Sequence, residues 1–530
     1  MNNKKKIKIN HSNEDYWNLK VNDNSIQSHY KLKFINSNPY KHCIIDNILN
    51  DNLLRSCRNV LDNVAFTRKE TDIYSLNQTG DLANLDGLND DEAKKLKSLA
   101  TLRNCLYSNS FLKFVENVTG CSPLSSKIID MAFNKYDTGC FLLNHDDVIG
   151  TRSISYILYL VDPDSEWLVE YGGSLELYPT KSKGVPCEAP STVIAPAWNR
   201  IVMFPVVPGF SFHSVEEVVG PGKERYSLQG WFHYAQEGEA GYDLGSIPEG
   251  LKQNSTLNQL LNAANDKFLV YKNPLPLDTP LSPDDIKVLT EFMNPEYLKL
   301  QSIEKIRDTF LDESKVNLQD FLNVETAKKM GLYISKMDNK CHFNPIKMTP
   351  HGTGVEEGWE VEGPPHVKRH LVFRPEKVDL NTNIFKVVLD GLKSNSFRKW
   401  LSLIGSSVLE SYHIIARRFR PGLDYTLATP NKTTCLDINL GLTPTHPVWD
   451  DGEHGGYECY MANDATEQDA AVYRVDAKDD VLLTTMANWN ILTIALRDEG
   501  VLKFVKYVSN QCARSRYDIE GEFPVVYDDE

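Results

Sequence analysis

A short motif of candidate metal ligands constrains the fold of this 530-residue chain more than any other feature. His145 and Asp147 stand two residues apart, so in a β-strand both side chains lie on one face of the sheet. His213 follows Asp147 by 66 residues. If a distant strand brings His213 to this pair, two imidazoles and one carboxylate meet on one face of a metal ion.

The segments around the motif have the pattern of a β-rich domain. Residues 155–161 and 200–205 are rich in strand-forming residues, and Gly172-Gly173 marks a turn that leads into another strand. This order is that of a double-stranded β-helix, the jelly-roll or cupin architecture. A triad with an open opposite face is typical of non-haem Fe(II) oxygenases. Arg225, 12 residues after His213, offers a two-pronged partner for the distal carboxylate of a bidentate keto acid.

Several longer stretches are similar to a known enzyme family. They are residues 135–147 (KYDTGCFLLNHDD), 157–160 (ILYL) and 172–178 (GGSLELY), together with the pair His213 and Arg225. Together they resemble the 2-oxoglutarate/Fe(II)-dependent ribosomal prolyl 3-hydroxylases, the relatives of the yeast termination-and-polyadenylation protein. The similarity runs from about residue 40 to the C-terminus, in the same two-domain order.

This resemblance implies a site for Fe(II) and for the cosubstrates 2-oxoglutarate and O2. The implied iron ligands are His145, Asp147 and His213, and Arg225 would pair with the C5 carboxylate of 2-oxoglutarate. Tyr136 and Tyr159 match family positions that also contact this cosubstrate. Tyr156 lies on the opposite strand face from Tyr159, and the family alignment alone chooses Tyr159.

The implied reaction is hydroxylation, at C3, of a prolyl residue in a small-subunit ribosomal protein. Succinate and CO2 are the implied coproducts, ascorbate is an expected reductant, and translation termination factors are further expected partners. Two other functions fit the residues: an oxygenase with another target, such as a lysyl or nucleic acid hydroxylase, and a translation scaffold that docks partners on the second domain. The lack of basic, aromatic-interleaved segments argues against nucleic acid. The complete ligand set argues against a scaffold alone.

The overall charge and the N-terminus limit the partners and the compartment. The net charge is −15 at pH 7, which repels nucleic acid phosphates and suits a basic protein substrate. No apolar run reaches membrane-spanning length, and residues 1–8 are basic without the apolar core of a signal peptide. The 10 cysteines lack Cys-x-x-Cys spacing and are predicted to be reduced thiols. We expect the nucleus, the cytoplasm or both, with the N-terminus either a nuclear signal or a solvated tail.

Composition predicts four parts along the chain. They are a disordered, Asn-rich tail (1–30), a catalytic oxygenase domain (31–236), a proline-containing linker with a short helix at 257–265 (237–280), and a second, non-catalytic domain (281–530). Within the catalytic domain, residues 43–65 have the apolar spacing of an amphipathic helix, residues 66–90 indicate an irregular polar segment, and residues 90–118 indicate one or two helices.

An internal repeat relates the two large domains. The recurring residues are Gly139 with Gly422 and Gly173 with Gly456, 283 residues apart, and Asn199 with Asn490 and Arg225 with Arg516, 291 residues apart. Matches at nearly constant spacing predict that the second domain is another double-stranded β-helix. The expected fold class is therefore mainly β with flanking helices (α+β), with two such barrels.

The same spacings predict that the second barrel has lost its metal ligands. They place Ala428 at the position of His145, Pro430 at that of Asp147 and Phe504 at that of His213. None of these side chains binds iron. We therefore expect a degenerate, inactive barrel in which Phe504 points inward and converts the polar pocket into apolar core.

Overall fold

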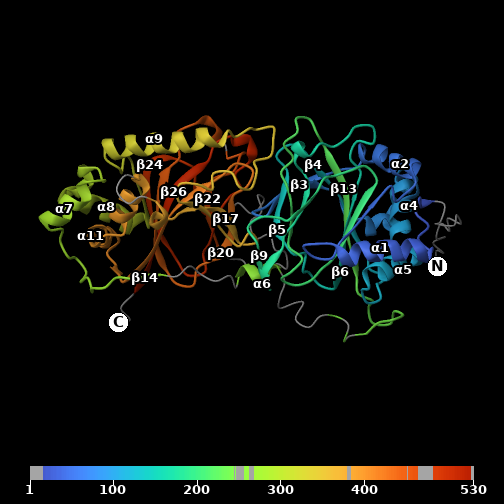
Figure 1. Ribbon diagram of the computed structural model, residues 1–530. Coiled ribbons are helices and arrows are strands. Elements are labelled where there is room, and N and C mark those ends of the chain that lie inside the picture. The colour runs from blue at the N-terminus through green and yellow to red at the C-terminus, as the bar shows by residue number, and fades with distance from the viewer. Residues whose placement is uncertain are drawn as a thin grey trace. The chain divides into compact units, whose positions relative to one another are not determined.

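The protein consists of two compact units, and each is built on one curled antiparallel sheet (Figure 1). The computed structural model describes residues 16–243, 245, 247, 256–261, 268–378, 383–450, 452–462 and 481–526. Unit 1 comprises residues 1–70 and 74–258, and unit 2 comprises residues 71–73 and 259–530. The predicted α+β class with two double-stranded β-helix domains is confirmed. No helix in the described part of the chain is long and apolar enough to cross a membrane.

The sheet of unit 1 brings strands that are distant in sequence next to each other. Its strands are adjacent in the order β1 (Cys43–Asp46), β11 (Arg200–Pro205), β6 (Arg152–Tyr159), β13 (Arg225–His233), β4 (Asp130–Tyr136), β3 (Tyr74–Gln78), β5 (Phe141–His145), β12 (His213–Val215), β7 (Leu175–Leu177) and β10 (Thr192–Ile194). β2 (Thr67–Glu70) pairs with β3, and β8 (Thr180–Ser182) pairs with β9 (Val185–Pro186). The neighbours β5 and β12 carry the two histidines of the motif.

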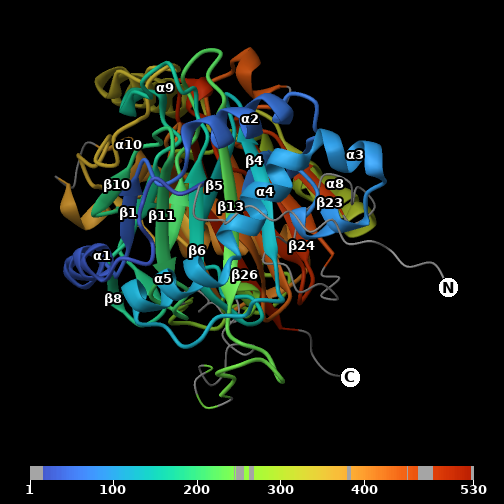
Figure 2. The ribbon, with the colours of Figure 1, turned by 90° about the vertical axis from the view of Figure 1, so that its right-hand side faces the viewer.

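Helices cover one face of the strands β6, β13 and β4. They are α1 (Asn24–Asn36), α2 (Asp51–Leu61), α4 (Lys97–Leu106) and α5 (Asn109–Thr119), while the short α3 (Asp90–Lys95) buries no residue and precedes α4. Figure 2 shows α2, α4 and α5 in front of these strands. The core of unit 1 joins Leu102 and Phe111 of the helices to Leu158 and Leu228 of the strands. Side chains alternate along a strand, and Leu228 faces the helices. Its neighbours Ser227 and Gln229 on β13 therefore face the inside of the barrel.

Unit 2 repeats the strand order of unit 1 position by position. The order is β15 (Lys315–Leu318), β24 (Trp489–Arg497), β21 (Cys435–Leu442), β26 (Arg516–Val526), β19 (Ser411–Phe419), β17 (Lys368–Phe373), β20 (Tyr425–Pro430), β25 (Leu502–Val505), β22 (Glu458–Met461) and β23 (Val481–Thr485). β14 (Leu269–Val270), β16 (Trp359–Glu362) and β18 (Val408–Leu409) pair with β19, β17 and β26. β16 therefore repeats the role of β2, so the repeat extends to the smaller strands.

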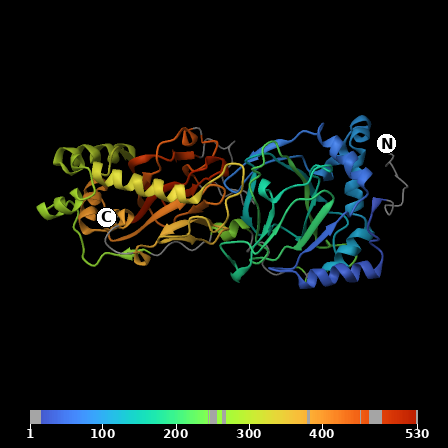
Figure 3. The ribbon, with the colours of Figure 1, turned by 45° about the horizontal axis from the view of Figure 1, so that its top comes forward.

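The helices of unit 2 also cover one face of its sheet. They are α7 (Pro283–Thr290), α8 (Leu300–Glu313), α9 (Val324–Cys341), α10 (Ile384–Leu392) and α11 (Asn395–Gly405). The long α9, yellow in Figure 3, lies along the strands. Met330 and Ile334 of this helix belong to the same buried core as Phe373 and Tyr517 of the strands.

Local details recur at matching positions of the two units. Asn199 and Asn490 both adopt left-handed backbone conformations, with φ of 58° and 57°. Each side chain accepts a hydrogen bond from a backbone N–H of a preceding loop, that of Leu49 at 3.0 Å and that of Leu322 at 2.7 Å. The repeat found in the sequence is therefore a structural one.

Four local predictions were wrong in part. In the expected disordered tail, residues 24–30 belong to α1, while residues 1–15 lie outside the described residues. The expected helix over 43–65 begins as strand β1, and α2 starts only after its N-cap Asn50. The expected irregular segment 66–90 contains β2 and β3. Residues 90–118 form three helices rather than one or two.

The linker region also differs from its prediction. The described part of the expected short helix is α6 (Thr256–Leu261), and its remaining positions, 262–265, lie outside the described residues. β14 pairs with β19, so part of the expected linker belongs to the sheet of unit 2. The strands β2 and β3 were not predicted because they are mostly polar. Their few apolar residues do not produce the alternation of apolar and polar residues that indicates a strand.

Candidate metal and cosubstrate site

The three predicted metal ligands converge at one place inside unit 1. His145 ends β5 and lies directly opposite His213, which begins β12. Asp147 follows in a left-handed conformation, with φ of 62°, that turns the chain back toward both histidines. Nε2 of His145 is 3.2 Å from Oδ1 of Asp147, and Nε2 of His213 is 3.3 Å from Oδ2. All three side chains are buried.

Backbone carbonyls select the imidazole tautomer that a metal requires. Nδ1 of His145 lies 2.8 Å from the carbonyl oxygen of Leu143, and Nδ1 of His213 lies 2.9 Å from that of Ser211. A carbonyl can only accept, so each Nδ1 carries the hydrogen and each neutral ring keeps a lone pair on Nε2. Both lone pairs then point toward the Asp147 carboxylate, an arrangement that a cation stabilises.

The carboxylate of Asp147 is held in its charged form. When no metal is bound, burial disfavours the charge, but the protonated rings of His213 and His145 attract the carboxylate and keep the pKa of Asp147 well below its usual range. Ser155 donates through Oγ to Oδ2 of Asp147 at 3.0 Å, which fixes the orientation of the carboxylate. The sequence reading missed Ser155, although its spacing of four from Tyr159 on β6 places both on the inner face.

A second carboxylate anchors the loop before His213. The buried Asp146 accepts from the backbone N–H of Gly209 at 3.0 Å through Oδ2, and its carbonyl oxygen accepts from Oγ of Ser211 at 3.1 Å. The two adjacent carboxylates therefore have different roles. Asp146 positions the loop before His213, and Asp147 faces the two histidines. The sequence reading missed Asp146, whose only signal is the Asp-Asp doublet.

The predicted cosubstrate residues meet on the inner face of β4, β6 and β13. Arg225 pairs in register with Tyr136, and its guanidinium carbon is 4.7 Å from the ring centroid of Tyr136 and 4.9 Å from that of Tyr159. Its Nε donates to the carbonyl oxygen of Gly173 at 2.7 Å, and Nη1 donates to Oγ of Ser227 at 3.1 Å. Burial raises the pKa of Tyr136 and Tyr159, so both phenols remain neutral donors.

The alternative tyrosine lies elsewhere. Tyr156 packs in the helix-covered core, where its ring stacks on Phe232 at a centroid distance of 4.6 Å. It therefore faces away from Arg225, as the odd spacing from Tyr159 requires.

The arrangement fits Fe(II) and 2-oxoglutarate. Among the described residues, His145, Asp147 and His213 form the group able to hold a metal, with ligand atoms within 4.8 Å of one another. Nε2 of His213, the hydroxyl of Tyr159 and Nη2 of Arg225 are buried and have no hydrogen-bond partner in the described part of the chain. Such atoms are costly unless a ligand satisfies them. A cation at the imidazole and a carboxylate at the hydroxyl and guanidinium would do so.

Comparisons with known proteins agree with this geometry. Residues 131–233 match the family described as "2OG-Fe(II) oxygenase superfamily", and residues 284–530 match "Oxoglutarate and iron-dependent oxygenase degradation C-term". Prolyl 3,4-dihydroxylase OGFOD1 of Ostreococcus tauri is 36% identical over 504 residues, which cover 92% of this chain and 95% of that protein. Prolyl 3-hydroxylase OGFOD1 of Xenopus laevis is 32% identical over 517 residues, which cover 90% and 84%.

The chain belongs to the OGFOD1 family. It is therefore a 2-oxoglutarate- and Fe(II)-dependent dioxygenase with a His-x-Asp…His triad, and the resemblance seen in the sequence is confirmed.

Unit 2 of this OGFOD1-family enzyme carries different residues at the ligand positions from those predicted. In unit 1, His213 pairs with His145 and Leu177; in unit 2, Lys503 pairs with Thr429 and Tyr460. The matching positions are therefore Thr429, Asn431 and Lys503. The predicted Ala428, Pro430 and Phe504 are each one residue away.

The error follows from strand periodicity. A shift of one residue moves every side chain to the other face. Phe504 accordingly does not point inward but packs with Ala428, Cys459, Met461 and Leu502. The repeat spacing changes by a residue between strands, and distant glycines could not reveal this.

The interior of unit 2 is charged rather than apolar. The Lys503 ammonium lies 3.2 Å from Oδ2 of Asp437 and also contacts Glu520. Burial opposes its charge, but Asp437 and Glu520 raise the pKa of Lys503 well above its usual value. Arg417 joins the same network through Asp518 at 2.7 Å. The expected conversion of this pocket into apolar core is thus wrong, because fixed ammonium and carboxylate groups occupy it.

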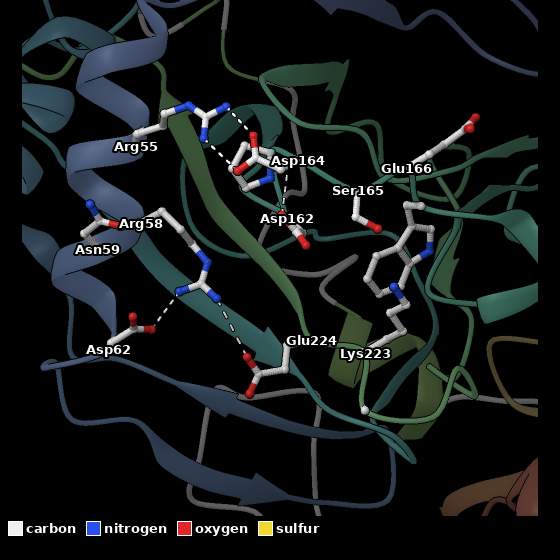
Figure 4. Close-up of a pocket in the computed structure, with 13 residues that line it drawn as sticks. Arg55, Arg58, Asn59, Asp62, Asp162, Asp164, Ser165, Glu166, Lys223 and Glu224 are labelled. Atoms are coloured by element: carbon white, nitrogen blue, oxygen red, sulfur yellow. Dashed lines mark hydrogen bonds and ion pairs between the residues drawn. The ribbon is translucent and has the colours of Figure 1, made fainter.

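A separate surface pocket of about 450 Å³ lies beside α2 (Figure 4). Its Arg55 contacts Asp164 at 2.8 Å, and its Arg58 contacts Asp62 at 2.8 Å and Glu224 at 3.7 Å. The two arginines are already paired, and none of the predicted ligands lines the pocket. We assign no function to it.

Proposed function

We propose that the protein hydroxylates a prolyl residue, at C3, in a small-subunit ribosomal protein. The observation that carries this proposal is the convergence of His145, Asp147 and His213 with Arg225 in a chain that matches relatives named prolyl hydroxylases along most of its length. A net charge of −15 favours a basic protein as the substrate over a nucleic acid.

In this proposal His145, Asp147 and His213 hold Fe(II), and Arg225, Tyr136 and Tyr159 hold 2-oxoglutarate. When bound, the metal and cosubstrate supply, with O2, the oxidation of an unactivated C–H bond coupled to the conversion of 2-oxoglutarate into succinate and CO2. The protein fixes the ligands through the carbonyls of Leu143 and Ser211, and it excludes water by burial. Ascorbate is the proposed reductant that keeps the metal ferrous.

A second outcome of the same chemistry is addition of two oxygen atoms to one proline. The Ostreococcus tauri relative is named a prolyl 3,4-dihydroxylase, whereas the Xenopus laevis relative is named a prolyl 3-hydroxylase. The mass added to the target proline, one oxygen atom or two, distinguishes the two outcomes.

The proposal includes partners and compartment. We propose that unit 2 offers a surface to the substrate or to translation termination factors, since its described residues include no group able to hold a metal as the triad of unit 1 does. A scaffold role would then coexist with catalysis. Such partners occur in the nucleus and cytoplasm, where we expect the protein to act.

The test is to incubate the protein with Fe(II), 2-oxoglutarate, ascorbate and small-subunit ribosomal proteins. We expect succinate release together with added oxygen on a proline, located by tandem mass spectrometry and assigned to C3 by NMR. His213→Ala serves as the inactive control. Oxygen placed on another residue type would instead support an oxygenase with a different protein target.

A further inference from the structure

Four polar side chains form a continuous hydrogen-bonded chain from the surface of unit 1 into its barrel. Lys69 donates to Oε1 of Gln78 at 2.6 Å. Nε2 of Gln78 donates to Oδ1 of Asn134 at 2.9 Å, and Nδ2 of Asn134 donates to Oε1 of Gln229 at 2.8 Å. The chain crosses β2, β3, β4 and β13 and runs from an exposed ammonium to a half-buried amide.

The lysine fixes the direction of this chain. An ammonium only donates, so Gln78 must turn its carbonyl oxygen toward Lys69 and its NH2 toward Asn134. Asn134 is 2% exposed and must then accept from Gln78 and donate to Gln229. Gln229 uses its oxygen as the acceptor, which leaves its NH2 as the last donor of the chain. Amide orientations that are otherwise ambiguous are therefore determined here.

This last amide faces the interior of the catalytic barrel. Gln229 lies on β13 at an even spacing from Arg225 and Ser227, whereas Leu228 packs into the helix-covered core. Two residues further, the ladder pairs Trp231 with Ser155, and Ser155 holds Asp147. The NH2 of Gln229 therefore points into the barrel from β13, on the opposite side of the barrel from β5 and β12, which carry His145 and His213.

We propose that Gln229 binds a backbone carbonyl of the prolyl substrate, and that Lys69, Gln78 and Asn134 are positioning residues that keep its NH2 turned toward that carbonyl. This inference rests on the proposed function. A proline in a peptide has no N–H, so the backbone around its ring offers acceptors, and a donor is the group that can hold it. Arg225 already serves the cosubstrate carboxylate, which leaves Gln229 for the peptide.

The direct test replaces Gln229. In Gln229→Glu, one carboxylate oxygen still accepts from Asn134, but the other presents an acceptor to the substrate carbonyl. We expect the KM for a synthetic peptide containing the target proline to rise about tenfold or more, the size of one lost hydrogen bond. The KM for 2-oxoglutarate should change less than twofold, a split that a general loss of structure would not give.

The remote test is Gln78→Glu. Both of its oxygens accept, so Asn134 must turn its NH2 toward residue 78 and its oxygen toward Gln229. Gln229 then donates to Asn134 and shows its own oxygen to the substrate. This half-exposed substitution should raise the peptide KM as Gln229→Glu does, and it keeps the test available if the inner variant does not fold. Gln78→Met does not fix the orientation of the Asn134 amide and should have a smaller effect on the peptide KM. Gln27→Glu, on α1 and outside this chain of amides, should have no effect.

Peptides with a thioamide at the proline carbonyl or at the preceding carbonyl identify the acceptor. A thioamide accepts weakly, so one of the two peptides should lose affinity for the wild type but not for Gln229→Glu. If the wild type hydroxylates no prolyl peptide, the proposed function fails. If it does, and both Gln229→Glu and Gln78→Glu keep the wild-type peptide KM, the proposed role of Gln229 alone is overturned.

Discussion

Asp518 and Arg516 lie two residues apart on β26, and Oδ2 of Asp518 accepts a hydrogen bond from Nη2 of Arg516 at 2.9 Å. The matching pair in unit 1 is Ser227 and Arg225, where Nη2 has no partner among the described residues. Arg516 also donates to the carbonyl oxygen of Gly456, as Arg225 does to that of Gly173. In unit 2 an internal carboxylate therefore takes the place that a cosubstrate carboxylate would take in unit 1.

This difference predicts one metal per chain. Equilibrium binding of Fe(II) to the intact protein should saturate at one ion, because Lys503 supplies the cation within unit 2. His145→Ala or His213→Ala should abolish iron binding and 2-oxoglutarate turnover while the thermal unfolding midpoint of the metal-free protein stays nearly unchanged. A second ion that persists in His145→Ala would contradict this account.

The ammonium of Lys503 should stabilise unit 2. Lys503→Met leaves Asp437 and Glu520 buried without their cation, and breaking a buried ion pair in this way costs about 3–5 kcal/mol. Hydrogen exchange of the β26 amides should show the loss. Lys432→Met, at an exposed lysine, is the matched control and should leave protection unchanged. Equal protection in both variants would mean that the network contributes little.

Arg225 should determine affinity for 2-oxoglutarate rather than for iron. Arg225→Lys keeps the charge but loses the fork geometry, and we expect the KM for 2-oxoglutarate to rise about tenfold or more. Fe(II) affinity should change little. Arg200→Lys is the control, because Arg200 is held by Asp46 at 2.6 Å. An unchanged KM would mean that another cation binds the carboxylate of 2-oxoglutarate. Arg152 would be the next candidate, although its guanidinium carbon already lies 3.4 Å from the ring centroid of Trp231.

The metal-ligand motif could be predicted from the sequence because its residue types and spacing are fixed by chemistry. The residue-by-residue alignment of strands between the two units could not. His145, Asp147 and His213 could be grouped because the triad has a fixed chemical pattern and the strands around it are strongly apolar. Phe504 was misplaced because one residue of offset reverses a strand's faces, and no local pattern reports such an offset. Gln78 was missed because its strand β3 is too polar to resemble one, although its amide contacts a buried partner.

The carboxyl group of Glu216, just after the end of β12, should make the stability of the fold depend on pH. Burial, together with the nearby carboxylate of Glu176, raises the pKa of Glu216 to about 8. Between the ordinary carboxyl pKa and this value, the folded protein binds a proton that the unfolded chain does not. The contribution of Glu216 to the free energy of unfolding is therefore favourable at low pH and is lost as the pH rises toward 8.

Glu216→Gln should remove this dependence, because the amide mimics the protonated acid and does not titrate. Relative to the variant, the wild type should lose up to about 1.4 kcal/mol of unfolding free energy per pH unit between pH 5 and 8. Denaturant unfolding of the metal-free protein across this range measures the difference. Glu237→Gln, at an exposed position of the same unit, should run parallel to the wild type. If Glu216→Gln also runs parallel to it, Glu216 is ionised throughout and its surroundings must solvate the charge.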